Sequence, residues 1–251
     1  MAKTEEQEIA SFGLIGKNIS YSFSKAYFNN KFTSMNLVNC SYENFDLSKI
    51  EELPALIKKH NTLKGLNVTI PYKEAIIPYL DRLNKKAERI GAVNTIKFTK
   101  DGLKGYNTDV YGFKKSFQPF IKKWHSKALI LGTGGASKAV AFVLNELGIS
   151  FKYVSRNPKG DQIGYTELNK KIIRSHNVII NCTPLGTFPD IEAKPNIPYE
   201  FLTSNHLLFD LIYNPVKTAF LLSGERKGAI ICNGAKMLEL QAEKAWRIWN
   251  S

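Results

Sequence analysis

The chain has 251 residues, of which 43% are hydrophobic, and a formal net charge of +13 at pH 7. This length and composition fit a globular protein with one large domain or two small ones. No apolar run reaches the ~18 residues that a membrane span requires, and no signal-peptide segment follows the start. The absence of a disulfide framework makes the reducing cytoplasm the expected location.

The cysteine spacing and the pattern of basic residues exclude further classes of protein. The three cysteines have unrelated spacings, so they form neither a disulfide framework nor a zinc motif, and each is expected to be a small core residue. The lysines occur as scattered doublets, without a zinc-finger, RNP-like or helix-turn-helix pattern, so nucleic acid is not an expected partner. The positive field instead favours an anionic substrate and a phosphorylated cofactor.

The first half of the chain alternates strand-like and helix-like segments after a charged, loosely held tail over residues 1–10. Strands are predicted over residues 11–16, 41–47 and 63–70, and a hairpin over 92–98 and 103–106. Helices are predicted over residues 24–32, 48–60, 73–89 and 110–123. Ser48 and Glu51 predict a capping box for the second helix, and Asp109 is the expected N-cap of the fourth.

The second half reads as a parallel sheet with crossover helices. Further strands are expected over residues 128–131, 151–154, 177–182, 207–212 and 229–232. A helix over 138–147 ends at Gly148, and a last amphipathic helix covers 235–249. We therefore predict two α/β domains: a domain with a mixed sheet over 1–109 with 235–251, and a Rossmann-type domain over 110–234. The C-terminal helix is expected to return to the first domain.

A glycine-rich turn between the first strand and first helix of the second half predicts a dinucleotide site. The first glycine permits a sharp turn, the second lets the backbone approach a pyrophosphate, and the helix N-terminus offers free N–H groups. Ser137 stands where a third glycine is usual, and a small residue suffices there. The turn comprises Gly132, Thr133, Gly134, Gly135, Ala136 and Ser137.

The residues after the next strand indicate which dinucleotide is preferred. The strand ends in Ser155, Arg156 and Asn157, with Lys159 close by and no carboxylate at the tip. A carboxylate would bond the ribose 2′-hydroxyl of NAD, whereas a guanidinium suits the 2′-phosphate of NADP. The sequence therefore predicts NADP.

The segment Gly65-Leu-Asn-Val-Thr-Ile-Pro-Tyr-Lys73 presents a lysine just after a short apolar strand. Asn67 and Thr69 alternate with apolar residues, which places both polar groups on one face. Pro71 ends the strand because it has no N–H to donate. Lys73 is therefore a candidate for a proton-transferring amine, although a surface lysine at a turn is the favoured interpretation when the segment is taken alone.

Several motifs taken together resemble the shikimate dehydrogenase family, and the match extends from Phe12 to Trp249. They are GLIG at 13–16, SxS at 22–24, NVTIPYK at 67–73, GAVNT at 91–95, GYNTD at 105–109, GTGGAS at 132–137, NCTPLGT at 181–187, DLIYNP at 210–215 and ML–LQ at 237–241. The resemblance implies an NADP-dependent oxidoreductase that reduces 3-dehydroshikimate to shikimate in chorismate and aromatic amino-acid biosynthesis. It also implies a small-molecule substrate and no metal, and leaves open a monomer or a homodimer.

The same resemblance implies roles for individual residues. Lys73 and Asp109 are the implied catalytic pair. Ser22 and Ser24 would hold the substrate carboxylate. Ring hydroxyls would be bound by Asn67, Thr69, Asn94 and Gln241, with Tyr213 near the substrate. The cofactor would contact the glycine-rich turn, residues 155–157 and, along its nicotinamide half, Thr183, Leu211, Gly234 and Met237.

The implied chemistry agrees with the residue types. Hydride delivery to a ketone leaves an alkoxide that needs a proton, which an ammonium group such as that of Lys73 can donate. A neighbouring carboxylate, here Asp109, would orient the amine and favour its charged form.

The chain also departs from the family pattern. Tyr21 and Lys25 flank the SxS pair where His and Pro are common, and Ser155 replaces an Asn. Lys85, Thr187 and Lys236 stand where an acidic residue, a Met and a Gly are common. Two alternatives remain open: a quinate/shikimate dehydrogenase that uses NAD, and a catalytically silent NADP-binding regulatory protein.

Overall fold

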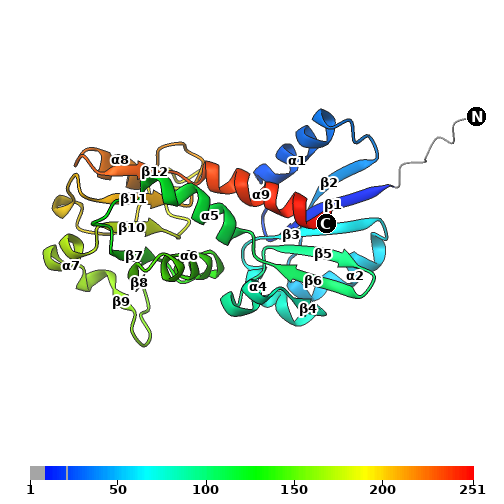
Figure 1. Ribbon diagram of the computed structural model, residues 1–251, viewed down its shortest axis with the longest axis horizontal. Helices are drawn as coiled ribbons and strands as arrows, with labels where there is room; N and C mark the ends of the chain where they lie inside the picture. The colour runs from blue at the N-terminus through cyan, green and yellow to red at the C-terminus, as the bar shows by residue number, and fades with distance from the viewer. Residues whose placement is uncertain (1–8, 21) are drawn as a thin grey trace, which may run out of the picture. The chain divides into compact units, whose positions relative to one another are not determined.

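The computed structural model describes residues 9–20 and 22–251 (Figure 1). Most of the predicted N-terminal tail and Tyr21 lie outside these residues. The chain forms two compact units. The first comprises the described residues up to Thr108 together with Ala245–Ser251, and the second comprises Asp109–Lys244.

The first unit contains a mixed sheet of six strands in the order β2-β1-β3-β5-β6-β4. β1 pairs in parallel with β2 and β3, whereas β5 is antiparallel to both β3 and β6. Its strands are β1 (Ala10–Gly16), β2 (Cys40–Asp46), β3 (Leu63–Val68), β4 (Arg82–Leu83), β5 (Thr95–Thr99) and β6 (Gly102–Tyr106). Its helices are α1 (Phe23–Ser34), η1 (Ile50–Glu52), α2 (Leu53–Lys59), α3 (Tyr72–Ala75), η2 (Ile77–Tyr79) and α4 (Lys85–Ile90).

The second unit contains a sheet of six strands that are all parallel. Its strands are β7 (Lys127–Leu131), β8 (Ser150–Ser155), β9 (Ile163–Gly164), β10 (Val178–Asn181), β11 (Leu207–Asp210) and β12 (Ile230–Cys232). Its helices are α5 (Asp109–Phe117), η3 (Gln118–Phe120), α6 (Gly135–Glu146), η4 (Tyr165–Glu167), α7 (Lys170–Ser175), η5 (Tyr199–Phe201) and α8 (Ala219–Glu225). The last helix, α9 (Ala235–Trp249), begins in this unit.

The strand order of the second sheet, β9-β8-β7-β10-β11-β12, is that of a Rossmann fold. The order reverses between β7 and β10, and ligands of such sheets bind outside the carboxyl ends of the strands at this point. β7 and β10 are buried apolar runs, Ala128–Leu131 and Val178–Ile180, as expected for strands covered on both faces. The predicted Rossmann-type domain is confirmed.

The last turns of α9 belong to the first unit, as predicted. Trp249 stacks on Phe12 with ring centroids 4.9 Å apart, and its indole N–H donates to the carbonyl of Ile96 at 2.9 Å. A Cβ atom at Gly65 would lie only 2.2 Å from the Trp249 ring nitrogen. Glycine at this position of β3 therefore allows the C-terminal helix to seat on the sheet.

Two predicted helices differ from the structure, and a proline explains each difference. The predicted helix over 73–89 is α3, η2, β4 and α4, because Pro78 interrupts the hydrogen-bond ladder. The helix predicted to end near Lys123 stops at Phe117, just before the 3₁₀ turn that contains Pro119, and Asp109 is its first residue rather than its N-cap.

The predicted capping box at Ser48 and Glu51 is displaced by one residue. The backbone N–H of Lys49 donates to the Glu52 carboxylate at 3.1 Å. The segment starts as the 3₁₀ turn η1 and becomes α-helical only at Leu53, with Pro54 in the first turn of α2. A proline is compatible with this position because the first helical N–H groups have no intrahelical acceptor.

Two further observations concern the molecule as a whole. Among the described residues, no helix is long and apolar enough to cross a membrane. The cysteines are free thiols and are partly buried rather than fully in the core. Burial raises the pKa of the Cys232 thiol to about 11, so this group is protonated at neutral pH.

Candidate functional site

A network of buried hydroxyl and amide groups crosses the first unit and contains three of the predicted substrate residues, namely Ser24, Asn67 and Asn94. Asn67, at the carboxyl end of β3, is only 5% exposed. Its Oδ1 accepts a hydrogen bond from the Tyr42 hydroxyl at 2.8 Å, and its Nδ2 donates to the Asn94 carbonyl and the Thr95 hydroxyl, each at 3.2 Å. The Asn67 amide is therefore held in one orientation.

Asn94 connects this network to the segment before α5. Its Oδ1 accepts from the backbone N–H of Thr108 at 2.7 Å, and its Nδ2 donates to the Thr108 hydroxyl at 3.0 Å. The Thr95 hydroxyl lies 3.1 Å from Asn94 Oδ1 and 3.2 Å from the Thr108 hydroxyl. Asn94, Thr95 and Thr108 are all at most 2% exposed, so these bonds fix the segment in a dry environment.

The predicted serine pair begins α1. Ser22 is the N-cap, and its hydroxyl accepts from the backbone N–H of Ser24 at 3.2 Å. Ser24 is 8% exposed, and its side chain lies close enough to the Tyr42 hydroxyl to affect the pKa of that group. Burial raises the pKa of Tyr42, and Ser24 opposes this rise only in part, so Tyr42 is a neutral donor at any pH of interest.

Lys73 and Thr69 follow β3, as the sequence predicts. Lys73 lies half-buried on the short helix α3, and its carbonyl accepts from the backbone N–H of Val93 at 2.7 Å. This bond ties the helix to the Gly91–Thr95 segment. The backbone N–H of Thr69 donates to Ile15 at 2.8 Å, and a Cβ atom at Gly16 would lie 2.6 Å from its methyl group.

The other predicted substrate and catalytic residues belong to the second unit. Asp109 is the first residue of α5 and is 5% exposed. Tyr213 follows β11 and is half-buried. Gln241 and Met237 lie on α9 against Gly112 of α5, where a Cβ atom would come within 2.5 Å of the Met237 carbonyl. Glycine at 112 therefore allows the two helices to approach closely.

The predicted cofactor turn lies at the carboxyl end of β7. Gly132 has a positive φ of 101°, which glycine adopts without strain. Gly134 is the N-cap of α6, and Gly135, Ala136 and Ser137 form its first turn. Ser137 is fully buried, and its hydroxyl donates to the Gly134 carbonyl at 2.7 Å. Thr133 is exposed.

Gly134 gives a direct test of whether this turn fits a dinucleotide. Its φ of −77° suits any residue, and a Cβ atom there would meet no protein atom within 4 Å. No packing inside the protein therefore requires glycine at 134. The missing side chain leaves open the space in front of the N–H groups of α6, which is where a pyrophosphate binds in Rossmann folds.

The second strand of this unit, β8, ends in a basic turn. The Ser155 hydroxyl accepts from the backbone N–H of Asn157 at 3.2 Å, which fixes the turn that carries Arg156. Arg156, Asn157 and Lys159 are exposed. Arg156 is also close enough to Tyr165 to lower the pKa of its hydroxyl, although burial has the larger, opposite effect. An exposed guanidinium at this strand end fits an anionic group such as a 2′-phosphate.

A second buried polar network supports the loops after β10 and β11. Asn181 and Asp210 are both fully buried, and Asn181 Nδ2 donates to Asp210 Oδ1 at 3.0 Å. Asn181 Oδ1 accepts from the backbone N–H and the hydroxyl of Thr183, at 3.0 and 2.6 Å. The Asp210 carboxylate also accepts from the Ile212 N–H and from the Thr218 hydroxyl.

This network holds in position two of the residues predicted to contact the nicotinamide half of the cofactor. Thr183 is fixed by Asn181 and lies beside the first glycine of the turn, since a Cβ atom at Gly132 would be 3.2 Å from its methyl group. Leu211 follows Asp210, and a Cβ atom at Gly234 would lie 2.1 Å from its carbonyl oxygen. Only glycine fits at position 234.

Burial raises the pKa of Asp210 to about 6, and hydrogen bonds from Thr218, Ile212 and Asn181 oppose the rise. The carboxyl group is thus an anion destabilised by burial at neutral pH, and it is protonated and neutral below the raised pKa. Sequence reasoning missed its role, although a charged residue directly after the apolar run Leu207–Phe209 was a visible signal.

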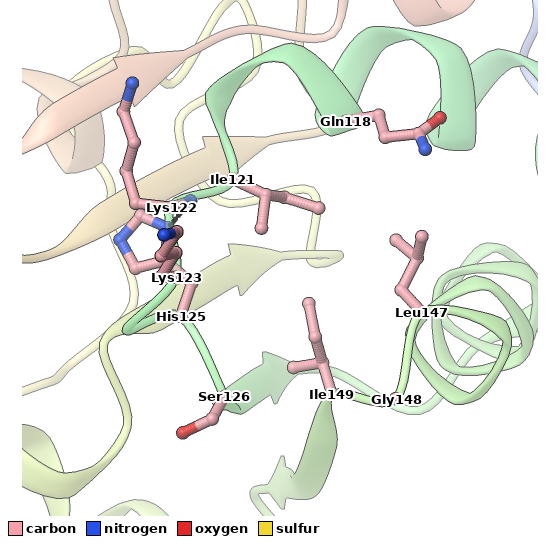
Figure 2. Close-up of a pocket in the computed structure, with 9 residues that line it drawn as sticks. All are labelled: Gln118, Ile121, Lys122, Lys123, His125, Ser126, Leu147, Gly148 and Ile149. Carbon is pink, nitrogen blue, oxygen red and sulfur yellow. Dashed lines mark hydrogen bonds between the residues drawn. The ribbon is translucent and has the colours of Figure 1, made fainter.

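A depression of about 450 Å³ lies elsewhere in the second unit (Figure 2). It is at the amino end of β7, opposite the end that carries the glycine-rich turn, and contains none of the predicted site residues. Its lining comprises Gln118, Ile121, Lys122, Lys123, His125, Ser126, Leu147, Gly148 and Ile149. His125 accepts from the Lys122 N–H and bonds the Asn205 carbonyl, so its ring has a structural role.

Two residues that depart from the family pattern form local ion pairs. Lys25 pairs with Glu43 at 2.7 Å, and Lys236 pairs with Glu239 at 2.8 Å. Within the described part of the chain, no cluster of three or more His, Cys, Asp or Glu side chains could hold a metal ion.

The fold and the site define a two-domain oxidoreductase that uses a dinucleotide: a Rossmann-type unit with a glycine-rich turn, and a unit with a mixed sheet that carries a buried polar network.

Comparison with known proteins places the chain within this class. The family model described as the shikimate dehydrogenase substrate binding domain matches residues 14–96. A shikimate dehydrogenase (NADP(+)) from Clostridium botulinum is 39% identical over 249 residues, which cover 94% of this chain and 95% of the relative. The chain belongs to the shikimate dehydrogenase family.

Solved structures of shikimate dehydrogenases are also similar to this chain. Shikimate dehydrogenase 1 from Peptoclostridium difficile superposes with a TM-score of 0.83 at 38% identity, covering 96% of this chain and 91% of that one. Shikimate 5-dehydrogenase from Thermus thermophilus, solved in complex with NADP(H) and shikimate, has a TM-score of 0.84 at 32% identity, with coverages of 96% and 93%.

Proposed function

We propose that the chain catalyses the reversible, NADPH-dependent reduction of 3-dehydroshikimate to shikimate, a step of chorismate and aromatic amino-acid biosynthesis. The observation that carries this proposal is the buried network through Ser24, Asn67 and Asn94, which presents hydroxyl and amide groups suited to a polyhydroxylated ring. Family membership over nearly the whole chain supports it, because relatives at this identity bear the name of this activity.

The cofactor in this proposal is NADP, held by the second unit. The N–H groups at the start of α6 would bind its pyrophosphate, with Gly132 to Ser137 forming the cradle. Ser155, Arg156 and Asn157 would contact the 2′-phosphate. The nicotinamide half would contact Thr183, Leu211, Gly234 and Met237. NADPH supplies the hydride when it is bound.

The substrate would be recognised through its carboxylate and ring hydroxyls. Ser22 and Ser24 are the proposed carboxylate ligands, because the start of α1 offers hydroxyls and N–H groups to an anion. Ring hydroxyls would be bound by Asn67, Thr69, Asn94 and Gln241, with Tyr213 nearby. The net charge of +13 favours approach of both anionic ligands.

Proton transfer is assigned to Lys73, with Asp109 as its acidic partner. Reduction of the ketone creates an alkoxide, and the Lys73 ammonium donates the proton that neutralises it. In the reverse direction the amine accepts the same proton. Asp109 would orient the amine and stabilise its charged form. The partly buried position of Lys73, next to the strand end that carries Asn67, supports this role.

Further features of the protein belong to the same proposal. The substrate-binding domain would comprise residues 1–109 with 235–251 and the NADP-binding domain residues 110–234. The protein would work in the cytoplasm as a monomer or homodimer, without nucleic acid. Size-exclusion chromatography with light scattering measures the mass directly, and a stable species larger than a dimer would contradict this part.

The test is an NADPH oxidation assay with 3-dehydroshikimate. We expect turnover with NADPH and much weaker turnover with NADH. Faster reaction with NAD and quinate would support the quinate/shikimate dehydrogenase instead, and absence of turnover together with retained NADP binding would support a silent NADP-binding protein.

A further inference from the structure

Tyr42, on β2, links two of the proposed substrate ligands and belongs to neither predicted ligand set. Its hydroxyl donates to Asn67 Oδ1 at 2.8 Å, and the Ser24 side chain lies close enough to lower its pKa. One phenol thus joins the residue assigned to the carboxylate with a residue assigned to a ring hydroxyl. The Tyr42 side chain has no exposed surface, so it cannot itself bind a ligand in this state.

Aromatic packing fixes the position of the Tyr42 ring. Phe28 of α1 stacks on it with ring centroids 4.6 Å apart and planes inclined by 12°. Trp249, at the end of α9, lies 6.5 Å away by ring centroids and is anchored to the Ile96 carbonyl. The ring is therefore held by both α1 and α9, and its hydroxyl has a defined place.

The consequence for Asn67 follows from its hydrogen-bonding capacity. Both N–H groups of its amide are donated inside the protein, to the Asn94 carbonyl and the Thr95 hydroxyl. Among the described residues, Oδ1 accepts from Tyr42 and keeps the capacity for one more hydrogen bond. In this arrangement Asn67 meets a ligand only as an acceptor, so the ligand must bring a donor such as a hydroxyl.

We propose that Tyr42 is a positioning residue for shikimate recognition, which fixes the Asn67 amide and the Ser24 hydroxyl in the orientation that receives the substrate. This assignment rests on the proposed function. Its effect is on binding of the ring rather than on hydride or proton transfer, because the same two ligands serve the ground state and the transition state.

The Tyr42→Phe variant tests the assignment because it keeps the stacked ring and removes only the hydroxyl. We expect KM for shikimate to rise about tenfold, as for loss of a bond between buried neutral groups, while kcat and KM for NADP stay near wild type. The matched control is Tyr199→Phe, which removes a hydroxyl that donates to the Pro195 carbonyl at 2.7 Å in the second unit. In that variant, kcat, KM for shikimate and KM for NADP should all stay near wild type.

A double-mutant cycle shows whether Tyr42 acts through its partner. In an Asn67→Ala background, Tyr42→Phe should add little to the rise in KM for shikimate. If Asn67→Ala does not fold, Ser24→Ala serves in the same cycle. An unchanged KM in Tyr42→Phe, full additivity in the cycle, or an equal rise in KM for NADP overturns the assignment. Absence of shikimate turnover in the wild type instead overturns the proposed function itself, and this assignment with it.

Discussion

The two buried polar networks of this protein, one in each unit, differ in composition and in what remains for a ligand. The network of the first unit is built from neutral hydroxyl and amide groups, and several members are themselves proposed substrate ligands. The network of the second unit contains a carboxylate, that of Asp210, and the amide of Asn181 uses both its N–H groups and accepts two hydrogen bonds.

We infer from this difference that the first network serves to bind the substrate and that the second supports the loops around the cofactor. Neutral groups that can donate and accept suit a substrate rich in hydroxyls, and they cost less to bury than a charge does. The network around the Asp210 carboxylate is bonded mainly to protein groups, and it fixes the loops that carry Thr183 and Leu211. The following predictions test this division, from the largest expected effect to the smallest.

Replacing Lys73 should separate chemistry from cofactor binding most clearly. We expect Lys73→Ala to lose at least about 10³-fold in kcat, since general acid–base groups contribute about 10²–10⁴-fold. NADP affinity should stay close to wild type, because the proposed cofactor residues all lie in the other unit. Steady-state kinetics and calorimetric NADP titration measure the two effects. Comparable losses in both would show that the division does not hold.

Replacing Asp210 tests the support network through its pH dependence. The pKa of Asp210 in the folded protein is about 6, above the ordinary 3.8, so the folded state binds more protons between these values. The stability contributed by this group is therefore complete below about pH 4 and is lost as pH rises through 6, a loss of about 3 kcal/mol.

Asp210→Asn removes this dependence. The amide keeps an acceptor for Asn181 and Ile212, and the Thr218 hydroxyl can turn to accept from the new N–H. Relative to wild type, the variant should gain stability between pH 4 and pH 7, as followed by thermal melting at each pH. A constant difference across this range would mean that the carboxyl group has an ordinary pKa.

Replacing Gly65 tests whether the end of α9 supports the substrate network. The new methyl group of Gly65→Ala would overlap the Trp249 ring, which packs near Tyr42. We expect a loss of about 1–3 kcal/mol in stability, as for overpacked cores, together with weaker shikimate binding. Gly148→Ala is the matched control, because no atom lies within 4 Å of its Cβ, although its φ of 70° carries a backbone cost of its own. Only the Gly65 variant should impair shikimate binding.

The smallest effect is expected at Arg156. Because this side chain is exposed, its charge is partly screened, and Arg156→Ala should raise KM for NADP by about tenfold without affecting KM for shikimate. KM for NAD should change little. A matched control is Arg174→Ala, on α7. Equal effects on NADP and NAD would contradict a role in binding the 2′-phosphate.

Much of the fold follows from local sequence signals. The glycine-rich turn, the apolar runs of the parallel strands and the hairpin with Gly102 at its turn each specify their own structure. The helix over 73–89 was mispredicted because its apolar spacing is periodic while Pro78 and the short strand β4 interrupt it. Strand β9 and helices α7 and α8 were missed, since two residues of strand and six or seven of helix give too short a periodic signal.

The site was predictable only where a residue stands in a recognisable motif. Ser24, Asn67 and Asn94 were proposed as ligands in this way, but Tyr42 was not, because a tyrosine in a strand is most often a core residue. Its proposed role depends on three segments that meet only in the folded unit. Asn181 and Asp210 lie inside quoted motifs, yet their function as supports became visible only through their hydrogen bonds.

The most direct test of the central claim is a crystal structure of this chain with shikimate and NADP bound. We expect the shikimate carboxylate on the Ser22 and Ser24 hydroxyls, a ring hydroxyl donating to Asn67 Oδ1, and the NADP pyrophosphate at the N-terminus of α6. Shikimate bound away from the Ser24–Tyr42–Asn67 network, or NADP bound away from the Gly132–Ser137 turn, would contradict the account.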